Sequence, residues 1–266
     1  MAELTPKRSQ VSDKAPFWRE FFILLGAGIV GVVAVIPYQF TLLGGLPEEI
    51  PIPFPLLLLL GILQNIVLLA LAIGVGLLCA RRVGLGAPIL EGWLRGERVD
   101  ERGRAILLPS ILLGLGAGLI IILLDMVVFA PYLAAFQEVE RPSPWQGFLA
   151  SFYGGIDEEI LLRLFMVSLL AWLLSRVWKD AEGTPTAGGM WLVIIVASVL
   201  FGLGHLPATA QLAPLTPLLV TRAIVLNGIA GLAFGYLYWK RGLESAMLAH
   251  FSADILLHVI LVPLVT

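Results

Sequence analysis

Seven long apolar stretches dominate the chain, and short polar stretches separate them. Each approaches or exceeds the ~20 mostly apolar residues that a helix needs to cross the hydrocarbon core of a bilayer. The predicted spans are Trp18–Phe40, Phe54–Ala80, Ala105–Ala130, Phe148–Trp178, Met190–Leu206, Leu215–Trp239 and Ser245–Val265. This pattern predicts an all-α, polytopic membrane bundle of about seven transmembrane helices.

The composition agrees with a bilayer as the solvent, because 59% of the residues are hydrophobic and only 14% are charged. A net charge of -2, with basic residues scattered among loops, indicates no nucleic-acid partner. We therefore expect lipids and membrane-associated chains as partners. Cys79 is the only cysteine, which excludes an intrachain disulfide and a thiolate cluster. A bound metal would need histidine and carboxylate ligands.

The basic residues also predict an orientation in the cell membrane. Six arginines lie between Arg81 and Arg104, and short loops rich in Lys and Arg stay in the cytoplasm. Counting spans from this loop places the N-terminus and the loops around Lys179 and Lys240 on the same side. The chain is predicted to be a single transmembrane domain over residues 1–266, with residues 1–16 as a disordered cytoplasmic tail.

Charged residues are concentrated at one point of the fourth predicted span. Asp157, Glu158 and Glu159 are followed four residues later by Arg163, and each ionised side chain at mid-membrane costs about 2.5–3.5 kcal/mol. Glu159 and Arg163 have the i, i+4 spacing of an ion pair. Glu158 is turned by about 100° from Glu159, so it is left free and desolvated, as a general base would be. The alternative is a water-exposed helix start, which the apolar residues after Ile160 disfavour.

Two histidines occupy later spans. His205 ends the fifth predicted span, where Phe201 shares its face and could shield it from lipid, while Gly202 and Gly204 allow close helix contact. Taken alone, His205 is more typical of an interfacial residue than of a catalyst.

The last predicted span carries His250 and Asp254 on one face, at i and i+4. His258 follows one turn later, and we interpret it as a polar residue near the outer interface. Asp125 and Arg222 are further intramembrane charges, which we expect to neutralise each other across helices.

In order, these residues form Glu-Glu-x-x-x-Arg (158–163), Phe-x-x-x-His (201–205) and His-x-x-x-Asp (250–254). The ordered triple resembles the CPBP family of intramembrane proteases, the CAAX protease and bacteriocin-processing group, also called Abi. The likeness covers roughly residues 151–266, and the first three spans are unassigned. Many members have an aromatic residue before the arginine and a glycine after it, where this chain has Leu162 and Leu164. Several relatives carry asparagine at the position of Asp254.

The resemblance implies peptide-bond hydrolysis within the membrane or at its edge, by catalytic helices in residues 148–265. Glu158 and His205 would activate a water, His250 and Asp254 would stabilise the oxyanion or hold the site together, and Glu159, Arg163 and Phe201 would give structural support. Asp254 could donate to an oxyanion only if protonated; otherwise it would orient His250.

A metal stays an open alternative at this stage. Glu158, His205 and His250 would leave one position free for water, as in a catalytic zinc site, yet the resemblance also allows a glutamate-activated water without metal. The expected substrates are membrane-associated, prenylated or leader peptides. The competing function is a non-catalytic scaffold or a proton-coupled transporter that uses the same buried polar residues. A transporter would often show internal repeats, and the sequence shows none.

Overall fold

The computed structural model describes residues 15–45, 52–132, 141–181 and 183–261. These residues form helices and no named strand, with one isolated bridge between Lys179 and Pro185. The proposed tail falls mostly outside the described residues. The α-helices are α1 (Phe17–Ala34), α2 (Ile36–Leu42), α3 (Phe54–Val83), α4 (Pro88–Leu94), α5 (Asp100–Leu124), α6 (Pro144–Phe152), α7 (Ser168–Leu174), α8 (Ala187–Gly204), α9 (Leu206–Leu212), α10 (Pro217–Arg241) and α11 (Leu243–Asp254). The π-helical segments are η1 (Asp125–Phe129), η4 (Tyr153–Glu158), η5 (Ile160–Val167) and η6 (Ile255–Ile260), and η2 (Ala130–Tyr132) is a 3₁₀ turn.

Six helical stretches of the described chain are long and apolar enough to cross a membrane, and they match six of the seven predicted spans. The remaining predicted span, the fourth, has a different build. It runs as α6, η4, η5 and α7, with only Glu159 between η4 and η5. Its four charged residues set it apart from the other spans. The all-helical, polytopic bundle is thus confirmed, and the charged stretch is a helix of mixed α and π turns, a feature often found at functional sites.

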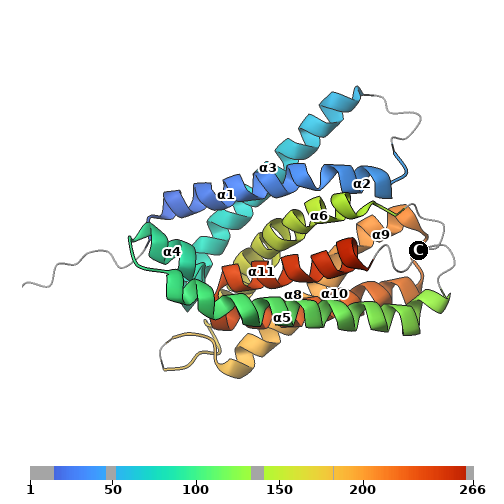
Figure 1. Cartoon of the computed structure of the whole chain (residues 1–266). Helices are drawn as coiled ribbons and strands as arrows, with labels where there is room; N and C mark the ends of the chain where they lie inside the picture. The colour runs from blue at the N-terminus through green and yellow to red at the C-terminus, as the bar shows by residue number, and fades with distance from the viewer. Residues whose placement is uncertain (1–14, 46–51, 133–140, 182, 262–266) are drawn as a thin grey trace, which may run out of the picture.

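The helix formed by α6, η4, η5 and α7 is called the charged helix from here on. It lies inside the bundle and is covered by its neighbours (Figure 1). Segment η5 packs against α3 and α8, while η4 packs against α1 and α11. The most extensive contacts between helices are those of α8 with α10 and of α5 with α11. Ile160 and Leu164 on the charged helix are fully buried. The outer helix faces carry exposed apolar side chains, such as Leu71 and Leu112, as expected for a surface that contacts lipid.

The basic loops share one end of the bundle. There Arg81 donates to the Ala15 carbonyl, Arg241 donates to the Ala105 carbonyl, and Leu243 donates through its backbone to Gly86. These bonds join the starts of α1, α5 and α11 to the ends of α3 and α10, and we call this the basic end. Helices α2 and α9 lie at the opposite end (Figure 1). This arrangement agrees with the prediction that the loop after Arg81 and the loop around Lys240 lie on the same side of the membrane. The cytoplasmic orientation of the basic end stays a prediction.

Candidate active site

The charged helix contains the ion pair that its spacing predicts. Nη1 of Arg163 lies 3.0 Å from Oε1 of Glu159, and both side chains are buried. The guanidinium lies over the rings of Phe201 and Phe234, at 5.2 and 5.4 Å from their centroids. These contacts tie the charged helix to α8 and α10. Because breaking a buried pair leaves a charge without compensation, this contact is a strong constraint on how the three helices pack.

Glu158 points away from Arg163 and towards two histidines. Oε1 lies 3.8 Å from Nε2 of His205, and Oε2 lies 3.6 Å from Nε2 of His250. Both distances exceed a direct hydrogen bond, so the carboxylate lies close to both Nε2 atoms without bonding to either.

The other ring nitrogen of each histidine is already bonded. Nδ1 of His205 lies 2.9 Å from the Phe201 carbonyl, and Nδ1 of His250 lies 2.7 Å from Oε1 of Glu159. A carbonyl or carboxylate oxygen can only accept, so each Nδ1 carries the proton. In the neutral tautomer, each Nε2 then presents a lone pair to Glu158. Each Nε2 can thus exchange a proton at the same point, accepting one when the ring is neutral and donating one when the ring is protonated.

The direct hydrogen bond to His250 comes from Glu159 and not from Asp254, and an orienting role of Asp254 stays a prediction. Oδ1 of Asp254 lies 3.7 Å from Nε2 of His250, outside hydrogen-bond range, whereas Glu159 makes the short bond to Nδ1. The i, i+4 spacing sets Asp254 beside the ring, while Glu159 reaches it from another helix. Glu159 therefore has two roles, since it holds Arg163 and also orients the imidazole of His250. Sequence spacing did not indicate the second role.

A cavity of about 420 Å³ lies against these residues. Glu158, His205, His250 and Asp254 line its inner part, and residues of α2 and α9 line it towards the end opposite the basic end. The cavity thus runs from mid-bundle towards the α2 and α9 end.

His258, which we interpreted as a polar residue near the outer interface, also lines this cavity. Its Nδ1 lies 3.3 Å from the hydroxyl of Tyr38, and its Nε2 lies 4.0 Å from Asp254. Segment η6 continues α11 without a break and keeps His258 on the face of His250 and Asp254. No pattern in the sequence indicates the contact between Tyr38 and His258, because the two residues lie in different predicted spans.

The surroundings of His205 match the expected shielding only in part. The Phe201 ring lies edge-on to His205, with 4.7 Å between ring centroids.

Gly202 does allow close packing, because a Cβ there would lie 2.5 Å from Cα of Ile224 on α10. Gly204 does not, since a Cβ there would have no neighbour within 4 Å among the described residues. The prediction for Gly204 is therefore wrong, because the end of α8 extends past the contact with α10.

The expected pairing of Asp125 with Arg222 is present. Nε and Nη2 of Arg222 lie 2.6 Å from the two carboxylate oxygens of Asp125. This bidentate arrangement is the geometry in which arginine binds carboxylates most strongly. It joins η1 to α10 at the edge of the cavity, and so fixes one cavity wall.

Asp157 faces away from the cavity and packs against α1. The residue is 1% exposed, and neither carboxylate oxygen has a hydrogen-bond partner among the described residues. A Cβ added at Gly31 would overlap this carboxylate. Gly31 therefore forms a notch that lets α1 and the charged helix touch, and the position of Glu158 depends on that contact.

Replacing Gly31 by alanine is expected to destabilise the protein by about 1–3 kcal/mol, the usual range for overpacking a tight contact. The measurement is thermal unfolding in detergent. Gly26→Ala on the same helix is the matched control, because a Cβ there meets no described atom within 4 Å. An equal loss of stability for both variants would contradict the role given to the notch.

The metal ligands predicted from the sequence are Glu158, His205 and His250. Among the described residues, no group of three or more His, Cys, Asp and Glu side chains is arranged to hold a metal ion. The Nδ1 atom of each histidine is bonded to an oxygen, as is usual when the other ring nitrogen binds a metal. A metal at these residues therefore stays a prediction, and no step of the reaction is derived through one.

Comparison with known proteins agrees with the motif resemblance. Residues 140–256 match the model of a family described as Type II CAAX prenyl endopeptidase Rce1-like. The matched segment contains Glu158, His205, His250 and Asp254 and leaves out α1 to α5. No curated protein and no solved structure matches the chain. The resemblance to the CAAX protease family that the three motifs predict is therefore confirmed.

Proposed function

The match of residues 140–256 to the Rce1-like family points to an intramembrane protease, and on this premise we propose that the protein is an endopeptidase that uses a water activated by Glu158 and His205. One observation carries the proposal. The Glu158 carboxylate lies between two imidazole Nε2 atoms, at 3.8 and 3.6 Å, on the wall of a cavity of about 420 Å³.

The proposed reaction begins with the water at Glu158. As its oxygen attacks the scissile carbonyl carbon, its proton passes to Glu158 or to Nε2 of His205. The tetrahedral intermediate then collapses, the C–N bond breaks, and the same proton is delivered to the leaving amine. The products are a carboxylic acid and an amine, so one water is consumed for each bond cleaved. Such positioned proton transfer typically contributes about 10²–10⁴-fold to the rate.

His250 and Asp254 face the same point from α11. The Glu159 carboxylate at Nδ1 favours the protonated imidazolium of His250, whose Nε2–H can donate to the oxyanion as charge develops. Asp254 lies beside this nitrogen and keeps it directed into the cavity. His250 is thus the proposed electrophile, and Glu159 is its positioning residue.

The cavity also suggests the class of substrate. Its wall includes apolar side chains from several helices, namely Val35, Leu42, Ile121, Leu226 and Leu257. Such a wall suits the apolar part of a lipidated or membrane-embedded peptide. If the basic end is cytoplasmic, as the positive-inside rule predicts, substrates enter from the other side of the membrane. This favours leader or membrane peptides over cytosolic prenylated proteins.

The test is cleavage of a panel of leader, membrane and prenylated peptides by purified protein in detergent. We expect hydrolysis by the wild type and loss of it in His205→Ala, while Gln211→Ala, an exposed change on α9, keeps it. A parallel arm adds a chelator, and inhibition that zinc reverses would show a metal-dependent reaction instead of the metal-free one. Folded protein that cleaves no peptide would support the scaffold or transporter alternative.

A further inference from the structure

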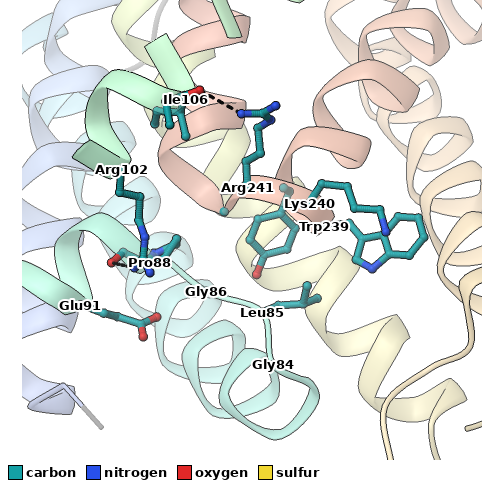
Figure 2. A pocket seen from close by; sticks show the side chains of 13 residues that line it. Gly84, Leu85, Gly86, Pro88, Glu91, Arg102, Ile106, Trp239, Lys240 and Arg241 are labelled. Carbon is teal, nitrogen blue, oxygen red and sulfur yellow. Dashed lines mark hydrogen bonds between the residues drawn. The ribbon is translucent and has the colours of Figure 1, made fainter. Parts of the chain in front are cut away.

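A second cavity, of about 410 Å³, lies at the basic end, and none of the proposed catalytic residues lines it. Figure 2 shows the side chains that line this cavity. Backbone of the segment between α3 and α4 forms one wall, including Gly84 and Gly86. Helix α4, the end of α10 and the start of α5 form the rest. Three of the side chains that line it are cationic, namely Arg102, Lys240 and Arg241, and one is acidic, Glu91.

The cations have no acidic partner at contact distance. Among the described residues, no ion pair within 4.0 Å involves Arg102, Lys240 or Arg241. One nitrogen each of Arg102 and Arg241 donates to a backbone carbonyl, Pro88 and Ala105 respectively. Those bonds hold each guanidinium in place and leave most of its five N–H groups available for a ligand.

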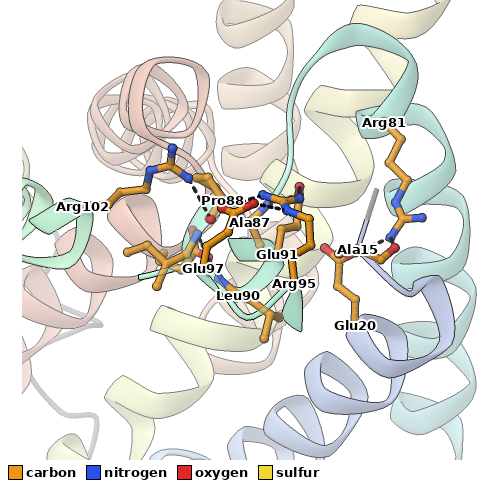
Figure 3. Close-up of polar contacts among 12 residues, drawn as sticks. Ala15, Glu20, Arg81, Ala87, Pro88, Leu90, Glu91, Arg95, Glu97 and Arg102 are labelled. Carbon is orange, nitrogen blue, oxygen red and sulfur yellow. Dashed lines mark hydrogen bonds and ion pairs between the residues drawn. The ribbon is translucent and has the colours of Figure 1, made fainter. Parts of the chain in front are cut away.

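The acids nearby are bound to other groups (Figure 3). Glu91 accepts from the Ala87 backbone and lies 3.7 Å from Arg95. Glu97 pairs with Arg95 at 2.6 Å, and this hydrogen bond lowers the pKa of Glu97, so Glu97 stays ionised and paired. The lining of the cavity therefore keeps a net positive charge of +2, from three cations and Glu91.

Aromatic side chains indicate the level at which this cavity lies in the membrane. Trp191 near the start of α8 lies 5.9 Å from Tyr236 and 6.1 Å from Trp239, between ring centroids. Trp239 also lines the cavity, and Lys240 lies over its ring at 3.4 Å. Clustered Trp and Tyr at helix ends are typical of the level of lipid headgroups. The cavity thus lies where a bilayer presents phosphate groups.

From these observations we propose that this cavity binds the phosphate of an anionic phospholipid headgroup. Arginine forks match phosphate oxygens well, and basic pockets between helices are known to hold anionic headgroups. The acyl chains would lie along the apolar outer surface of α8 and α10, beside Trp191 and Tyr236. A soluble phosphate has the same anionic chemistry but lacks these chains.

The test measures thermal unfolding of the purified full-length chain in phosphatidylcholine micelles, titrated with phosphatidylglycerol, extra phosphatidylcholine or inorganic phosphate. Selective binding to the folded state raises Tm by mass action. The pocket variant is Arg102→Gln with Lys240→Gln and Arg241→Gln. The control variant is Arg98→Gln with Arg104→Gln and Arg176→Gln, which removes the same charge from exposed positions outside the cavity.

We expect phosphatidylglycerol to raise Tm of the wild type and of the control variant by several degrees, and the pocket variant to lose more than half of that shift. Equal losses in the two variants would overturn the proposal in favour of general surface charge. An equal shift with phosphatidylcholine would remove the requirement for an anion. An equal shift with inorganic phosphate would assign the cavity to a soluble anion instead of a lipid. If the pocket variant fails to fold, the single variant Lys240→Gln is compared with Arg104→Gln.

Discussion

Replacing Glu158 by glutamine should lower the rate of peptide hydrolysis by about 10²–10⁴-fold, the usual contribution of a general base. Glutamine has nearly the same shape but cannot take a proton from the attacking water of the proposed reaction. Because the Glu158 side chain is 21% exposed and makes no direct hydrogen bond among the described residues, its loss should leave Tm nearly unchanged. The measurement is the initial rate of cleavage of the best peptide, together with thermal unfolding.

Glu97→Gln is the matched control for this change, because Glu97 is a solvent-exposed carboxylate at the basic end. It should retain wild-type activity. A Glu158→Gln protein that is fully active would contradict the proposed role of the carboxylate. A drop in Tm as large as that of a core variant would instead show that Glu158 supports the fold.

Replacing Arg163 by methionine should reduce the stability by about 3–5 kcal/mol, the typical cost of leaving one member of a buried ion pair without its partner. Arg163 is 2% exposed and Glu159 is 0% exposed, so water cannot replace the lost contact. Thermal or denaturant unfolding in detergent would measure the change. Arg104→Met, at an exposed position, should have little effect.

The double variant Glu159→Gln with Arg163→Met separates stability from catalysis. Removing both charges should restore part of the stability, since no buried ion is left unpaired. Hydrolysis should not recover, because His250 then lacks the carboxylate at its Nδ1. A double variant that regains activity as well as stability would show that Glu159 acts only through Arg163.

The fold class and most site positions could be predicted because each depends on local patterns. Apolar runs of membrane-spanning length give the helices, and i, i+4 spacing gives the Glu159–Arg163 pair and the common face of His250 and Asp254. The different directions in which Glu158 and Glu159 point follow from the angle between successive helical residues. These inferences need no knowledge of which helices are neighbours.

Contacts between helices could not be predicted in the same way. The bond from His250 to Glu159 joins residues 91 positions apart, and the contact of Tyr38 with His258 joins residues 220 apart. A lone tyrosine in an apolar span has no periodicity that indicates its partner. The same limit explains the error for Gly204, because the point where α8 leaves α10 depends on the crossing of the two helices.

The notch at Gly31 has a consequence for where the functional unit begins. The family match starts at residue 140, yet Gly31 and Tyr38 come from α1 and α2. Gly31 supports the charged helix, and Tyr38 lines the cavity at Glu158. A fragment limited to residues 140–256 would expose Asp157 and open the cavity wall. In evolutionary terms, substitutions at Gly31 and Asp157 should covary among relatives, even though only the second lies within the shared segment.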